Sequence, residues 1–131
     1  MTCKVFQMKA PALSLLVLRT AKMEATREFY HALGLELNQE QHGSDPVHFS
    51  CELTNTVLEI YPGANGEAPE RKSGGATMLG FSVSSLDALL SVLKTQATQV
   101  ITEPKDSLWG RRAVVLDPDG RAVELSELRT E

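Results

Sequence analysis

The stretch WGRRAVVLDPDGRAVEL, residues 109–125, predicts two strands joined by one tight turn. The turn is 117–120: the aspartate at its first position can hydrogen-bond the backbone ahead, the proline at its second presets φ, and the glycine at its fourth tolerates positive φ. Residues 113–116 before it have the composition of a strand, and residues 122–125 after it alternate. Glu124 therefore points to the face opposite its apolar neighbours. A carboxylate on one chosen face of an apolar strand suggests a functional role.

The composition is that of an ordinary folded domain. The chain has 131 residues, of which 42% are hydrophobic and 23% charged, and this suits a single domain, 1–131, with a hydrophobic core. The net charge of −4 and the pI of about 5.4 argue against nucleic acid and anionic membranes as partners. No apolar run reaches the roughly 18 residues that a membrane span needs.

The N-terminus and the cysteines indicate a cytoplasmic protein. Residues 1–20 carry only a short apolar patch and lack the long apolar region and small-residue cleavage site of a signal peptide. Cys3 and Cys51 lie far apart and form no CxxC pattern. We therefore expect reduced thiols rather than a disulfide.

The two halves of the chain repeat one order of elements, strand–helix–strand–strand–strand. In the first half, the patterns predict a strand at 13–20, a helix at 22–33, and strands at 35–41, 47–53 and 56–61. In the second half, they predict a strand at 78–83, a helix at 86–97, a short strand at 100–101, a loop at 102–108 and the closing hairpin. Module one thus covers about 13–61 and module two about 76–128, and the Gly- and Pro-rich segment 62–75 is a linker.

Local signals mark the ends of the two helices. Gly34 is a plausible stop for the first helix, just beyond its C-terminal end. Ser84 and Ser85 can cap the second, with Asp87 three residues after Ser84 in a start that resembles a capping box.

Strand alternation divides the strand residues between two faces. One face should pack on the helices; it carries Leu16, Leu18, Leu58, Ile60, Leu79, Phe81, Val83, Val123 and Leu125. The opposite face mixes apolar and polar groups, namely Leu15, Arg19, Glu59, Met78, Ser82 and Glu124. Such a mixture is usual in a ligand pocket. We therefore expect an α+β fold in which two βαβββ modules form a curved, cleft-enclosing sheet.

Four stretches together resemble the vicinal oxygen chelate superfamily, the group of glyoxalases, bleomycin resistance proteins and extradiol dioxygenases. They are LLVLRTAKMEATREFYHALGLE (15–36), TVLEIYP (56–62), LGFSVSSLDALL (79–90) and WGRRAVVLDPDGRAVEL (109–125). They span nearly the whole chain. The resemblance implies two βαβββ modules around a cleft, within a homodimer.

In metal-dependent members, the resemblance implies four ligand positions for a divalent ion, in the first and last strand of each module. Here these positions fall on Leu15, Glu59, Met78 and Glu124. A leucine cannot ligate a metal, and a thioether is a poor ligand for Ni, Zn, Mn or Fe(II). Two carboxylates with waters would hold Mg²⁺ or Ca²⁺ only weakly. We therefore expect no metal ligands and no cofactor, with a divalent metal ion as the alternative.

Two carboxylates that face one cleft without a metal repel each other, so a proton, water or a cation must offset the repulsion. We hypothesise that Arg19 pairs with Glu59, Glu124 or both, and Arg112 is a second candidate cation. In the alternative interpretation, Arg19 and Glu59 lie at the rim and are simply solvated. His48 shares its predicted face with Ser50 and Glu52, which suggests a polar solvent face rather than a catalytic base.

The candidate ligand-binding residues follow from these faces: Arg19, Glu59, Tyr61, Met78, Ser82, Trp109, Arg112 and Glu124. Tyr61 and Trp109 are as compatible with core packing or a dimer contact as with a pocket wall. If the protein is an enzyme, its candidate catalytic residues are Glu59 and Glu124, either of which can act as a general base.

Two classes of function remain open. One is a metal-free protein that binds a small molecule in its cleft, where the acidic pair would suit a cationic or amine-bearing ligand. The other is a divalent-metal-dependent lyase, isomerase or dioxygenase of the glyoxalase type. The missing imidazoles argue against the second class.

Overall fold

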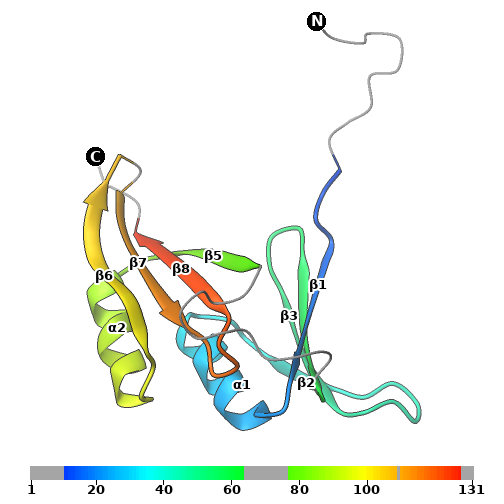
Figure 1. Cartoon of the computed structure of the whole chain (residues 1–131). Helices are drawn as coiled ribbons and strands as arrows, with labels where there is room; N and C mark the ends of the chain where they lie inside the picture. Colours follow the sequence, from blue (N-terminus) through cyan, green and yellow to red (C-terminus); the bar gives the residue numbers. More distant parts are fainter. Residues whose placement is uncertain (1–10, 64–76, 109, 128–131) are drawn as a thin grey trace, which may run out of the picture.

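The computed structural model describes residues 11–63, 77–108 and 110–127. Module one contains β1 (Leu15–Thr20), α1 (Met23–Ala32), β2 (Asn38–Glu40), β3 (His48–Glu52) and β4 (Val57–Pro62). Module two contains β5 (Met78–Val83), α2 (Leu86–Thr95), β6 (Val100–Ser107), β7 (Gly110–Leu116) and β8 (Ala122–Glu127). The predicted repeat and the α+β class are confirmed (Figure 1). Trp109 and most of the predicted linker lie outside the described residues.

Each module forms its own four-stranded sheet with the same topology. The strand orders are β1-β4-β3-β2 and β5-β8-β7-β6. In both sheets the first strand pairs parallel with the last, and the remaining pairs are antiparallel. The helix between the first two strands of each module makes the crossover that returns the chain to the sheet. The two sheets are curved and do not join into a closed barrel (Figure 1).

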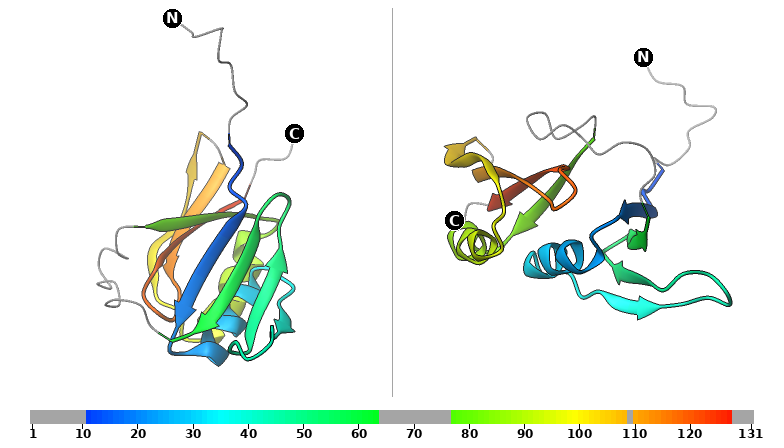
Figure 2. Two further views of the ribbon diagram at one scale, coloured as in Figure 1. Left: turned by 90° about the vertical axis from the view of Figure 1, so that its right-hand side faces the viewer. Right: turned by 60° about the horizontal axis from the view of Figure 1, so that its bottom comes forward.

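The two helices lie side by side and share one hydrophobic core with the helix-facing sides of both sheets (Figure 2). The predicted inward residues of the last strands are fully buried: Leu58, Ile60, Val123 and Leu125. Burial of each such side chain contributes roughly 2 kcal/mol, so this apolar stripe is a main source of stability. Among the described residues, no helix is long and apolar enough to cross a membrane.

The helix ends obey their local signals, with one correction. Gly34 has φ of 111°, and its N–H donates to the His31 carbonyl while the Leu35 N–H donates to that of Tyr30, a Schellman motif. At α2, Ser85 is the N-cap and its Oγ accepts from the Ala88 N–H at 3.3 Å. The predicted box from Ser84 to Asp87 is therefore wrong by one residue.

Two strands differ from their predicted lengths. β2 covers three residues rather than 35–41, because Leu35 and Leu37 pack into the core before the chain pairs with β3. β6 runs over 100–107, where a short strand and a loop were predicted. It is an edge strand, and its register against β7 shifts on either side of Thr102, including across Pro104. An edge position and an irregular ladder accommodate both the proline and the polar composition.

A buried polar cluster that the sequence did not predict joins the two modules. The turn forms as expected, with the Gly120 N–H donating to the Asp117 carbonyl and Asp117 Oδ1 accepting from the Asp119 N–H at 2.9 Å. The other carboxylate oxygen accepts from the Tyr30 hydroxyl of α1 at 2.6 Å and from Arg121 at 2.9 Å. Burial, followed by the nearby Asp117 charge, raises the pKa of Tyr30 well above its ordinary value. This cluster anchors α1 to the hairpin of module two.

Candidate functional site

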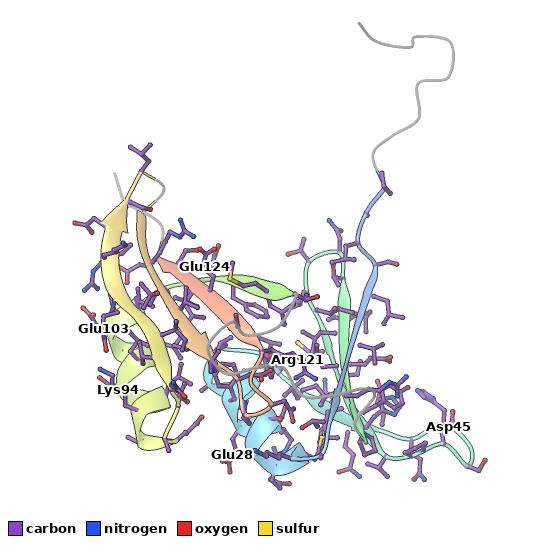
Figure 3. The ribbon with its side chains drawn as sticks, viewed as in Figure 1. Glu28, Asp45, Lys94, Glu103, Arg121 and Glu124 are labelled. Carbon is purple, nitrogen blue, oxygen red and sulfur yellow. The ribbon has the colours of Figure 1, made fainter. Side chains whose placement is uncertain are left out.

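The face of each sheet that turns away from the core is called here the open face. The register of β4 against β1 sets Glu59 opposite Val17, and that of β8 against β5 sets Glu124 opposite Gly80. Both carboxylates therefore lie on open faces, as the alternation predicted, and Figure 3 shows Glu124 on β8. Their side chains are 19% and 21% exposed. Half-buried carboxylates of this kind are accessible to a ligand while partly shielded from water.

Glu59 and Glu124 line separate hollows. The hollow of module one has a volume of about 680 Å³ and includes Glu40, Ser50 and Glu59 in its lining. The hollow of module two has a volume of about 270 Å³; it is lined by Thr102, Lys105, Ser107, Arg112, Val114 and Glu124. The second hollow thus combines two cations, hydroxyls and one carboxylate.

The cation at Glu124 is Arg112, the second candidate, which contacts the Glu124 carboxylate across the β7–β8 pair. Arg19 is exposed, and its guanidinium carbon lies 5.7 Å from the centre of the Tyr61 ring. Within the described residues, no ion pair joins Arg19 to Glu59 or Glu124. The hypothesis that Arg19 fixes the acidic pair is therefore wrong.

At Glu59 the neighbour is His48, and here the predicted solvent face is wrong. His48 is fully buried and stacks on Tyr61 of β4, with ring centres 4.2 Å apart and planes 10° from parallel. His48 Nε2 lies 3.9 Å from Glu59 Oε2 and 3.4 Å from Glu40 Oε1. Pairing of β3 with β4 brings the histidine to the carboxylate. Folding 47–53 back on 56–61 in antiparallel register would have predicted this proximity from the sequence.

Large apolar side chains are also exposed on the open faces. Leu15 is 52% exposed on β1 and Met78 is 54% exposed on β5, where Ser82 is exposed as well. Each hydrocarbon surface lies on the same face as one of the carboxylates. Each open face therefore offers apolar contact beside a negative charge.

Comparisons with known proteins agree with this architecture. A family model described as Glyoxalase/Bleomycin resistance protein/Dioxygenase superfamily matches residues 12–125. No curated protein sequence matches the chain significantly.

Several solved structures share the fold. A glyoxalase/dioxygenase from Nostoc punctiforme superposes with a TM-score of 0.71 at 19% identity, covering 95% of this chain and 98% of its own. TnmS3, an antibiotic binding protein from a Streptomyces species, gives 0.65 at 22% identity, with 94% and 100% covered. The oxidase ChaP-H2 gives 0.69 at 17% identity, with 92% and 96% covered. At these sequence identities, the similarity shows a shared fold and nothing more.

The residues at the four usual metal positions do not fit a divalent ion of the superfamily type. Leu15 and Met78 supply no strong donor, and a register slip of two residues would replace them with Val17 and Gly80, which supply none either. Of the two remaining carboxylates, Glu124 already contacts a guanidinium. This donor set lacks the imidazoles that the resemblance implies.

Proposed function

Because the chain belongs to the Glyoxalase/Bleomycin resistance protein/Dioxygenase superfamily, we propose that it binds a small cationic, partly apolar molecule on its open faces. In this proposal no catalytic metal occupies the four usual positions. The observation that carries it is the pairing of exposed apolar side chains with half-buried carboxylates on the same faces, Leu15 with Glu59 and Met78 with Glu124. An amine would approach the carboxylate while its hydrocarbon part covers the apolar side chain.

The hollow of module two contains one carboxylate of this site, Glu124. Arg112 contacts Glu124 from the same hollow, and the side chain of Arg112 is 41% exposed. An entering ammonium group would therefore compete with Arg112 for the carboxylate, which favours ligands that carry both an amine and an acceptor for the displaced guanidinium. TnmS3, an antibiotic binding protein, is one precedent for small-molecule binding on this fold.

A homodimer is part of the proposal. The resemblance implies one, and a second copy would cover exposed apolar side chains outside the ligand contacts, such as Leu13 and Leu108. We also place the protein in the cytoplasm, where Cys51, a buried free thiol, would stay reduced.

A thermal-shift screen of primary amines and quaternary ammonium compounds, each beside a neutral analogue of the same shape, tests the proposal. We expect cationic members to stabilise the protein and their neutral analogues to have little effect. Glu124→Gln should weaken the best compound about tenfold or more, because a hydrogen bond to a charged group contributes roughly 1.5–3 kcal/mol.

Glu103→Gln is the matched control, since Glu103 is an exposed glutamate on β6 that pairs with Lys94 on α2. It should leave the affinity unchanged. Equal binding of cationic and neutral analogues, or equal loss in the two variants, would contradict the proposal.

A further inference from the structure

Three potential metal ligands gather at the edge of module one, away from the four usual positions. They are Glu40 of β2, His42 of the following hairpin and His48 of β3, whose donor atoms all lie within 4.8 Å of one another. His42 Nε2 is 3.5 Å from Glu40 Oε1, and His48 Nε2 is 3.4 Å from the same oxygen. Oε2 of Glu59, on β4, lies 3.9 Å from His48 Nε2.

The surroundings of His48 Nε2 suit a positively charged ligand. Its Nδ1 lies 3.2 Å from the carbonyl oxygen of Pro46, and because a carbonyl can only accept, Nδ1 carries the proton. A neutral ring then has a lone pair on Nε2. That atom is fully buried and has no hydrogen-bond partner among the described residues. It faces the carboxylates of Glu40 and Glu59, which are also acceptors.

Acceptors in this arrangement repel one another unless a positive centre lies between them, and a buried nitrogen without a hydrogen-bond partner is unfavourable. The distances suit such a centre. A tetrahedral zinc ion with bonds of about 2.1 Å holds neighbouring donor atoms about 3.4 Å apart. The separations from Glu40 Oε1 to the two histidine nitrogens, 3.5 and 3.4 Å, meet this spacing.

We propose that Glu40, His42 and His48 bind a divalent ion of the zinc, nickel and cobalt class. Two imidazoles favour these ions over Mg²⁺ and Ca²⁺, which prefer all-oxygen sites. The Pro46 carbonyl and the stacked Tyr61 ring fix the imidazole of His48, as outer partners commonly do for metal-binding histidines. None of these three residues occupies one of the four usual superfamily positions.

The ion would hold the two ends of the hairpin between β2 and β3 together, since Glu40 ends β2 and His48 begins β3. This hairpin projects from module one, with Asp45 near its tip (Figure 3), and internal hydrogen bonds hold it, from the Asp45 N–H to the His42 carbonyl and from Gln41 Nε2 to the Asp45 carbonyl. Glu40 and Glu59 also line the hollow of module one. A bound ion would therefore form part of the wall of that hollow.

Calorimetric titration of the untagged, chelator-treated full chain with ZnCl₂ tests the proposal. We expect one ion per chain, and a shift of the His48 Nε2 resonance in a ¹⁵N-edited spectrum of the wild-type protein during the titration. His42→Ala and Glu40→Gln should each weaken Zn²⁺ binding at least tenfold. His42 is 65% exposed, so its replacement leaves the fold intact, which circular dichroism checks.

His31→Gln is the matched control, since His31 is the one histidine of the chain outside the proposed site and is exposed on α1. It should bind Zn²⁺ as the wild type does. Absence of saturable binding, an unmoved His48 resonance, or equal weakening in His31→Gln and His42→Ala would overturn the proposal. The small-molecule proposal is tested separately through Glu124, which lies in the other module, so the two can fail independently.

Discussion

At the scale of single residues, the positions of Glu59 and Glu124 could be predicted from the sequence, whereas the burial of His48 could not. Alternation alone places Glu59 and Glu124 on the open faces, because a strand has a fixed period of two. It also places His48 on the face of Glu59, yet it cannot say that Tyr61 and the hairpin cover that ring. The burial of a side chain depends on which strands pair beside it, and the local sequence pattern does not specify that pairing.

The hydroxyl of Tyr30 gives a residue-scale prediction. Tyr30→Phe removes a hydrogen bond to the buried Asp117 carboxylate, so the free energy of unfolding should fall by about 2 kcal/mol at pH 7 in urea denaturation. Tyr61→Phe, at the other tyrosine, should cost less. Equal losses in the two variants would contradict an anchoring role for Tyr30.

The raised pKa of Tyr30 adds a pH dependence. Above about pH 10 the unfolded chain loses the Tyr30 proton while the folded chain keeps it, so the unfolded state binds fewer protons and stability falls as pH rises. Urea denaturation between pH 9 and 11, values chosen around the ordinary tyrosine pKa of about 10, should show the wild type losing its advantage over Tyr30→Phe. A constant difference would show that the hydroxyl titrates alike in both states.

At the scale of elements, the sequence was reliable wherever one local signal decides the structure. The turn at 117–120 and the stop at Gly34 formed as predicted. Strand β6 was predicted too short because its pairing with β7, rather than its own polar composition, makes residues 102–107 a strand.

Gly34 provides the element-scale prediction. Its φ of 111° disfavours any residue with a Cβ atom, although no atom lies within 4 Å of the added carbon. Gly34→Ala should therefore destabilise the protein by about 1 kcal/mol through backbone strain alone. Gly80→Ala is the control: its φ is not in the strained region and its added carbon makes an ordinary contact. Thermal denaturation should separate the two, and an unchanged midpoint for Gly34→Ala would contradict this account of the helix end.

At the scale of the whole molecule, duplication explains why the fold could be predicted. It gives no information on the hydrogen bond between Tyr30 and Asp117 that joins the two modules. The repeated order of elements fixes two sheets with the same topology. The contact of Tyr30 with Asp117 joins residues far apart in sequence, and nothing near either residue signals it.

Assembly is the whole-molecule prediction. Exposed apolar side chains outside the proposed ligand contacts, such as Leu13 and Leu108, should be covered in a homodimer. Sedimentation velocity at micromolar concentration should give twice the mass of the 14.3 kDa chain. A monomer over the whole concentration range would contradict the dimer.

The central claim is that the open faces bind a cationic molecule without a metal at the usual positions. The most direct measurement is calorimetry of the best cationic compound with chelator-treated protein, beside untreated protein and Glu124→Gln. We predict the same affinity with and without chelator, and a loss of about tenfold or more in the variant. Binding that vanishes on chelation and returns with added metal, while Glu124→Gln binds normally, would contradict the claim.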